Sequence, residues 1–271
     1  NYYSSGNFDR AIATLESFVS QYPTSTNRNK GELYLGCSYL TRGTLATDIQ
    51  SARTHFNYIL TQGENADSYR DAFFHNARSY YNEKSYLYAE TLLTQFINKY
   101  PNDNFLEYCY YYLGVCETNL GKFDQAISYY TLSETKYPNS PFKWHCLLEK
   151  ATAIGRQGKY VEADAQLASL IVMPGAPADI IGTATMGRAI VALIQNKPQE
   201  SVTLLETYIQ QNRTNRELVT TIQDCYLTES YAYFTMRDYQ RALNAINQLE
   251  ALDNLLTPEA ALFKLKLLLC L

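Results

Sequence analysis

The chain has 271 residues, of which 46% are hydrophobic and 18% are charged, and its net charge at pH 7 is -4. This composition is typical of a folded protein and excludes a disordered one. The slightly acidic balance, without any cluster of Lys and Arg, argues against nucleic acid as a partner. No apolar run reaches the roughly 18 residues that a transmembrane helix needs, so we expect no direct membrane span.

The same phrase occurs twice along the chain. Residues 6–25 read GNFDRAIATLESFVSQYPTS and residues 121–140 read GKFDQAISYYTLSETKYPNS. Both contain a small residue, here called the anchor, that follows an aromatic residue at a distance of three positions. Anchors recur at Ala11, Ala89, Ala126, Ala163 and Ala242, and at Ala52 and Ser201 with the aromatic residue replaced. They are spaced 37 to 41 residues apart, which indicates a repeat protein.

Each repeat unit reads as a pair of helices. In the fourth unit the small Gly114 lies twelve residues before the anchor Ala126, and the large Tyr130 lies four residues after it. Gly121 breaks the chain between the two helices, and Pro138 ends the second one. Small residues allow the two helices to approach closely, and we expect the large ones to fill the space between pairs. Because no pair can bury its apolar faces alone, stacked pairs would share one continuous core.

The predicted fold is therefore all-α, an α-solenoid of antiparallel helix pairs with about fourteen helices. The predicted organisation is 1–27, the second half of a first unit; 28–64, a second unit with a long internal turn at 42–47; then units at 65–103, 104–140, 141–177, 178–215 and 216–256; and 257–271, a terminal helix that could begin a further unit. The terminal segment ends in LFKLKLLLCL, which is too apolar to face solvent. We expect it to be covered, or the chain to be part of a longer array.

The pattern of Leu-Gly, an aromatic residue before the anchor Ala, and a closing Pro resembles the tetratricopeptide repeat. In the fourth unit the residues at that family's spacings are Tyr110, Leu113, Gly114, Ala126, Tyr130 and Pro138. The longer units with Tyr-Pro are similar to tetratricopeptide proteins of the bacterial cell envelope. The resemblance implies a right-handed superhelix whose first helices line a concave groove, with a protein or peptide partner bound in that groove.

The sequence carries no recognisable catalytic or metal-binding motif. Three of the six cysteines, Cys109, Cys146 and Cys225, fall at the same repeat position, so we interpret them as packing residues. Their spacing fits neither a zinc site nor a disulfide framework. We expect no catalysis, no cofactor and no metal. Six unpaired thiols favour a reducing compartment such as the cytoplasm, whereas the resemblance implies the bacterial envelope or periplasm, and both stay open.

The resemblance and the register of the anchors place a set of candidate partner-binding residues in the concave groove. They are Phe74, Arg78, Tyr81, Asn82, Tyr108, Tyr111, Asn119, His145, Arg156, Tyr231 and Phe234, with Met186, Ile190 and Asp224 on the same face. Large aromatic side chains and Arg are enriched in protein interfaces. Because the chain has 25 Tyr, some of these rings are expected in the core instead.

The sequence thus predicts a protein-interaction scaffold, which could belong to a larger assembly. One alternative is an architectural or sensor segment of a longer repeat protein whose groove is filled by its own chain. A remote alternative is a helical-toroid enzyme, although such enzymes line a cavity with Trp and paired acids, and Trp144 is the single Trp here.

Overall fold

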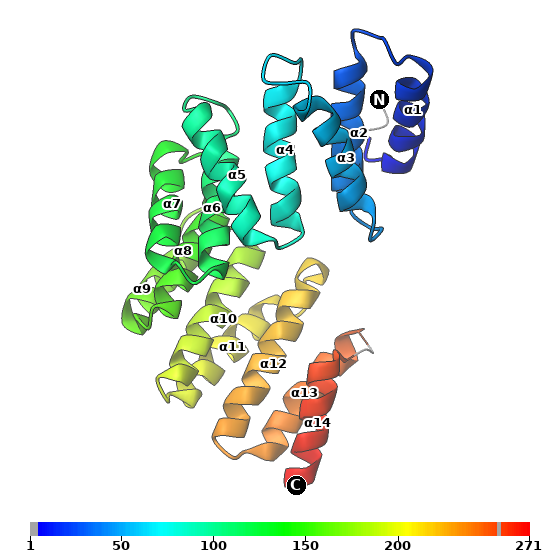
Figure 1. Ribbon diagram of the computed structural model, residues 1–271. Coiled ribbons are helices and arrows are strands. Elements are labelled where there is room, and N and C mark those ends of the chain that lie inside the picture. The colour runs from blue at the N-terminus through cyan, green and yellow to red at the C-terminus, as the bar shows by residue number, and fades with distance from the viewer. Residues whose placement is uncertain (1–4, 254–255) are drawn as a thin grey trace. The chain divides into compact units, whose positions relative to one another are not determined.

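The computed structural model describes residues 5–253 and 256–271, and these residues form fourteen α-helices, one short 3-10 helix and no strand (Figure 1). The helices are α1 (Phe8–Gln21), α2 (Arg28–Arg42), α3 (Asp48–Leu60), α4 (Tyr69–Asn82), α5 (Tyr86–Lys99), α6 (Leu106–Asn119), α7 (Phe123–Lys136), α8 (Lys143–Arg156), α9 (Tyr160–Ile171), α10 (Ala178–Ile194), α11 (Pro198–Asn212), η1 (Arg216–Leu218), α12 (Val219–Thr235), α13 (Tyr239–Asp253) and α14 (Pro258–Cys270). The predicted all-α fold is confirmed.

The chain divides into two compact parts, an N-terminal half up to Lys136 with α1–α7 and a C-terminal half from Tyr137 with α8–α14. Within each half, consecutive helices pack on one another. Alternate helices also touch, α2 with α4 and α4 with α6 in the N-terminal half, and α8 with α10 and α10 with α12 in the C-terminal half. The surface formed by these alternate helices is called the first-helix face of each half.

The break between the two helices of a pair has the same backbone geometry along the chain. Five residues before the anchor, the backbone adopts a positive φ in Gly6, Lys84, Gly121, Gly158, Asn196 and Arg237. This left-handed conformation is favourable for glycine and strained for most other residues. This geometry explains why three of the six turns carry glycine and a fourth carries Asn at this position.

Packing within a pair follows the predicted small positions. The anchors Ala52, Ala89, Ala126 and Ala242 are fully buried, and so is Tyr130. A β-carbon on Gly114 would lie only 2.4 Å from the Tyr130 ring, so Tyr130 of α7 packs directly on α6. This ring therefore packs within its own pair, and the expectation that such large residues also fill the space between pairs stays a prediction.

The long turn predicted in the second unit is present between α2 and α3. Arg42 donates to both carboxylate oxygens of Asp48. The distance is 3.1 Å from Nε to Oδ2 and 2.5 Å from Nη2 to Oδ1. The same carboxylate accepts from the backbone N–H of Leu45. Arg42 holds the pKa of the buried Asp48 carboxyl below its usual range, which keeps this turn closed by a charged pair. The predicted boundaries of the repeat units stay a prediction.

Five of the six cysteines are buried free thiols and Cys270 is an exposed one. Among the described residues no group of His, Cys, Asp and Glu side chains is arranged as metal ligands would be. In the same part of the chain no helix is long and apolar enough to cross a membrane.

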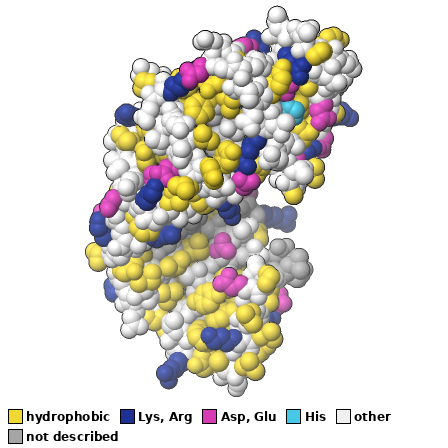
Figure 2. Space-filling model, viewed as in Figure 1, with side chains coloured by type: hydrophobic (Ala, Val, Ile, Leu, Met, Phe, Trp, Pro, Cys, Tyr) yellow, Lys and Arg dark blue, Asp and Glu magenta, His cyan; other side chains and the backbone are white. Residues whose placement is uncertain are grey.

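The last helix, α14, buries one face and exposes the other. Phe263 and Leu267 are buried, whereas Leu262, Leu265 and Leu269 are 70%, 59% and 88% exposed. Figure 2 shows hydrophobic side chains at the surface of the C-terminal half. The described residues leave the outer face of α14 uncovered, and the expectation that it is covered, or that the chain is part of a longer array, stays a prediction.

Candidate functional site

Four of the predicted groove residues meet around one tyrosine of the N-terminal half. The Tyr81 ring of α4 lies 4.4 Å from the Tyr112 ring of α6, measured between centroids. Tyr111 lies 5.6 Å from Tyr112, and Tyr81 hydrogen-bonds to Tyr111. Arg78 and Tyr108 also act electrostatically on Tyr112. These five residues are called the Tyr112 cluster, and Tyr112 itself was not among the predicted groove residues.

The Tyr112 cluster is half-buried rather than closed. Tyr81, Tyr108, Tyr111 and Arg78 are partly exposed, whereas Tyr112 is buried at 7% exposure. Burial, with smaller contributions from Tyr111 and Tyr112, raises the pKa of Tyr81 above its usual value. The Tyr81 hydroxyl therefore remains a neutral donor over the physiological pH range.

Arg78 is the cation of this surface, and among the described residues its guanidinium has no hydrogen bond or ion pair. Its charge lowers the pKa of the neighbouring His75, together with the larger effect of burial, to about 4. His75 is therefore neutral, and its Nδ1 has no described hydrogen-bond partner. The arrangement combines one positive charge with tyrosine hydroxyls and ring faces, which suits a carboxylate next to an apolar group.

Three predicted groove residues of this half have other roles or lie apart. Phe74 is only 2% exposed and stacks on Phe105 at 4.1 Å, so its assignment to a groove is corrected: it is a core residue. Asn82 is exposed and, with Tyr81, lines a small hollow of about 400 Å³ beside Leu40. Asn119 is exposed, and its side chain donates to the Val115 carbonyl of its own helix.

In the C-terminal half, two predicted groove aromatics are covered by α14. The Phe263 ring lies 4.3 Å from the Tyr231 ring and 5.5 Å from the Phe234 ring. The Tyr231 hydroxyl also donates to Glu259 at 3.2 Å, and Lys266 lies over Phe234. Their assignment to an open groove is corrected, because they hold α14 on α12.

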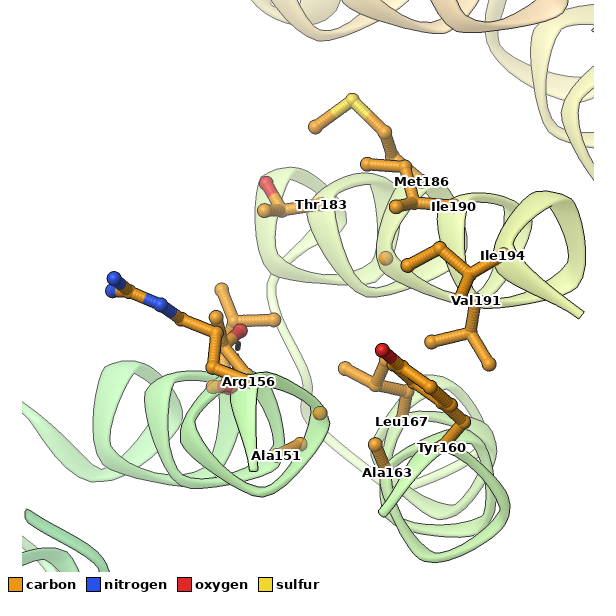
Figure 3. Close-up of a pocket in the computed structure, with 14 residues that line it drawn as sticks. Ala151, Arg156, Tyr160, Ala163, Leu167, Thr183, Met186, Ile190, Val191 and Ile194 are labelled. Atoms are coloured by element: carbon orange, nitrogen blue, oxygen red, sulfur yellow. Dashed lines mark hydrogen bonds between the residues drawn. The ribbon is translucent and has the colours of Figure 1, made fainter. Parts of the chain in front are cut away.

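The C-terminal half contains an open apolar cavity of about 460 Å³ between α8, α9 and α10 (Figure 3). It is called the Gly155 pocket. It brings together three residues that the register placed on one face, Arg156, Met186 and Ile190, while His145 is exposed elsewhere on α8. The lining residues are Leu148, Ala151, Thr152, Gly155, Arg156, Tyr160, Ala163, Leu167, Thr183, Met186, Gly187, Ile190, Val191 and Ile194.

The floor of the Gly155 pocket is buried and its rim is open. Ala151, Ala163 and Leu167 are at most 3% exposed, whereas Ile190 and Ile194 on α10 are 42% and 54% exposed. Figure 3 shows Ile190 and Met186 on α10 across the pocket from Ala151 and Arg156 on α8. The rim therefore consists of residues of the first-helix face.

Acidic side chains of this half are held in partly apolar surroundings. Burial raises the pKa of Glu149 on α8, while His145 and Arg156 act in the opposite direction. Burial and the nearby Glu206 raise the pKa of Glu229 on α12 to about 7. Neither acid faces a nucleophile or a second catalytic group in the described contacts, so the arrangement offers charge and shape for binding.

The comparisons with known proteins agree with this architecture. Residues 1–25, 71–103 and 108–140 match the family described as Tetratricopeptide repeat. No curated protein matches the chain in sequence. Because the matching solved structures are less than 25% identical to this chain, they show the fold alone.

Three solved structures illustrate the match. A tetratricopeptide repeat protein from Parabacteroides merdae has 16% identity and a TM-score of 0.69, covering 98% of this chain and 94% of its own. The apo form of RapI has 10% identity and a TM-score of 0.71, and the match covers 96% of this chain and 76% of the RapI chain. A chain of the Cut9–Hcn1 hetero-tetramer of the APC/C has 15% identity and a TM-score of 0.63, and the match covers 98% of this chain and 47% of that one.

The tetratricopeptide fold is commonly a scaffold for protein interactions and is generally not catalytic. The three matched segments carry the repeat pattern, and solved structures of that fold extend along nearly the whole chain. The chain therefore has an α-solenoid fold, and three of its segments match the tetratricopeptide repeat.

Proposed function

We propose that this chain is a protein-interaction scaffold that binds a peptide or a partner's surface on its first-helix face, without catalysis. The observation that carries the proposal is the Tyr112 cluster, where Arg78 lacks a described partner among half-exposed tyrosines. Tyr and Arg contribute large contact area and strong directional contacts, and they are the residues in which binding energy concentrates. The solved structure of Cut9–Hcn1, a complex built on this fold, supports the class of function.

The cluster predicts the kind of contact a partner would make. An acidic side chain can pair with Arg78, and an apolar one can lie against the rings of Tyr81 and Tyr111. Such a surface suits an extended or helical segment with one or two apolar anchors. An affinity near micromolar, about -8 kcal/mol, is ordinary for a reversible adaptor.

The test is capture of a partner by immobilised protein, followed by its identification and a binding titration. The double variant Tyr81→Ala with Tyr111→Ala should abolish binding, and Arg78→Gln should weaken it, while the circular dichroism spectrum stays helical. Tyr112 is left unchanged because it is buried.

The matched controls are Gln125→Ala on α7 and Thr203→Ala on α11, two exposed residues that are not part of the cluster. They should bind as the unchanged protein does. If these control changes weaken binding and the tyrosine changes do not, the alternative of an architectural segment takes the place of this proposal.

A further inference from the structure

The Gly155 pocket exists because two repeat positions that usually carry side chains carry glycine. Eight residues before the anchor, the other units have Tyr81, Thr118, Leu193 and Phe234, where this unit has Gly155. Fourteen residues before the anchor, they have His75, Tyr112, Glu149 and Thr228, where the next unit has Gly187. Both glycines line the cavity. The missing side chains leave a space of about 460 Å³, within the roughly 300–1,000 Å³ of pockets that hold ligands.

The glycines are not explained by backbone geometry. Neither adopts a positive φ, and both lie inside helices, where glycine is less favourable than alanine. A β-carbon on Gly187 would lie 3.0 Å from a methyl group of Leu167, so close packing of α10 on α9 favours glycine there. A β-carbon on Gly155 would meet only the Ala163 β-carbon, at an ordinary 3.4 Å. The fold would therefore accept a side chain at position 155, and its absence keeps the pocket open.

The rim of the pocket is adapted to an apolar group. Ile194 occupies the position seven residues before the anchor, where other units carry the polar Asn82, Asn119, Arg156 and Thr235. Ile194 and Ile190 are about half exposed beside the opening, and Met186 of the same helix also lines the pocket. An apolar group in the pocket would remove these side chains from water, which is favourable in proportion to the area buried.

The charge of the rim specifies what accompanies the apolar group. Of the described side chains that line the pocket, Arg156 is the one that carries a charge, and it also acts on the Glu149 carboxyl of the same helix. Figure 3 shows it extending from α8 at the edge of the cavity, away from the apolar residues of α10. The hydroxyl groups of Thr152 and Thr183 also line the pocket, and each donates to a carbonyl of its own helix. A guanidinium at the edge of an apolar cavity is complementary to a carboxylate next to an apolar side chain.

We propose that the Gly155 pocket binds one bulky apolar side chain, Leu, Ile, Met or Phe, of a partner's peptide segment that carries Asp or Glu next to it. The inference rests on the proposed scaffold function and names the chemistry of the partner at a second place on the chain. It assigns Gly155 as the residue that determines the size of the bound group, and Arg156 as the residue that selects the acidic neighbour.

The experiment follows the methyl signals of the three methionines, Met173, Met186 and Met236, in protein labelled with carbon-13 at the Met methyl group. The probe is a capped heptapeptide of Ser and Gly with a central Leu and an adjacent Glu. Its titration should move the Met186 signal in a saturable way and leave the other two in place. A peptide with Ala instead of Leu should leave Met186 unmoved, and one with Gln instead of Glu, or the variant Arg156→Gln, should weaken binding several-fold.

The decisive variant is Gly155→Leu, which fills the pocket with the residue that Leu193 provides at the same position of the next unit. It should fold, with an unchanged or higher thermal midpoint, and lose the Met186 response. Thr203→Leu, which adds the same side chain at an exposed position of α11, should keep it.

Three results would overturn the proposal: an equal response to the Ala peptide, a retained response in a folded Gly155→Leu protein, or a Met186 response to decanoate with none to the peptides, which would make the cavity an acyl-chain site. The double variant Tyr81→Ala with Tyr111→Ala should still give the Met186 response. Failure of the pocket and failure of the Tyr112 cluster as a partner site are therefore distinguished.

Discussion

A β-carbon built on Gly114 would lie 2.4 Å from Cε1 of Tyr130, so the Tyr130 ring occupies the space that any side chain at position 114 would need. The same relationship joins Gly36 and Phe56, where the distance is 2.5 Å. The glycine of the Leu-Gly pair and the large residue of the following helix are thus one packing unit. This contact explains why both recur together along the sequence.

Gly114→Ala should therefore destabilise the protein. Overpacking a filled core costs about 1–3 kcal/mol, and because the Tyr130 ring is fully buried it has little room to move. The gain in helix propensity from Gly to Ala, about 1 kcal/mol, only partly offsets that cost. Urea unfolding followed by circular dichroism measures the change in the free energy of unfolding.

The matched control is Gly155→Ala, also inside a first helix. Its β-carbon would make an ordinary 3.4 Å contact, so the propensity gain should dominate and raise stability by about 0.5–1 kcal/mol. Equal effects of the two substitutions would contradict the packing described here.

A substitution at Lys84, in the turn between α4 and α5, should stabilise the protein. Lys84 has a φ of 64°, and Gly121 has a φ of 77° at the same repeat position. The left-handed conformation costs a non-glycine residue about 1–2 kcal/mol, and glycine loses some of that advantage through its greater freedom in the unfolded chain. Lys84→Gly should therefore raise the free energy of unfolding by about 0.5–1 kcal/mol in the same assay.

The reverse substitution, Gly121→Ala, tests the same cost of a positive φ in a residue other than glycine. A β-carbon at position 121 would meet no atom within 4 Å, so any cost of Gly121→Ala comes from the backbone alone. We expect a loss of about 1 kcal/mol. A neutral result would mean that the turn relaxes to another conformation.

The repeat register could be predicted from the sequence because it depends on contacts inside one helix pair. The anchor Ala126, the small Gly114 and the break at Gly121 all serve local packing or local backbone geometry, so each leaves a residue type at a fixed spacing. The long turn between α2 and α3 was visible for the same reason, since Leu35-Gly36 comes four residues early relative to Ala52.

The candidate sites were predicted less well, because the register tells which way a side chain points and not what covers it. Phe74 points as expected, but Phe105 from the turn before α6 stacks over it. Tyr231 and Phe234 are covered by Phe263 of α14 in the same way. The Gly155 pocket could have been recognised from the absence of a large residue at positions 155 and 187. A search for packing residues that recur in every unit does not detect such an absence.

The cysteines should react in two classes. Burial raises the pKa of Cys37, Cys116 and Cys225 to about 12, so their reactive thiolate forms are scarce at neutral pH, and Cys270 is exposed. Excess iodoacetamide at pH 8 should add one group per native chain and six per chain in denaturant, as counted by mass spectrometry. The singly modified protein should keep its helical spectrum. A second rapid adduct on the native chain would show that a buried helix opens readily.

The pH dependence of stability should include an identifiable contribution from Glu229. Its side chain on α12 is buried near Glu206, whose Oε1 accepts a hydrogen bond of 2.7 Å from the Tyr233 hydroxyl. Burial first, and Glu206 second, raise the pKa of Glu229 from 4.5 to about 7. Between these two pH values the folded chain holds a proton that the unfolded chain releases. The stabilisation is therefore complete below about pH 4.5 and lost as the pH rises through 7.

Glu229→Gln should remove this dependence, because the amide resembles the protonated acid in size and carries no charge. At pH 8 the variant should be more stable than the unchanged protein by about 1–3 kcal/mol, since one pKa unit corresponds to about 1.4 kcal/mol. At pH 4.5 the two proteins should differ little. Urea unfolding at both pH values measures the difference, and the exposed Glu217→Gln serves as a control that should behave alike at both. If Glu229→Gln gives no gain at pH 8, the carboxylate of Glu229 is ionised in the folded protein at no cost, and the buried surroundings described for α12 are wrong.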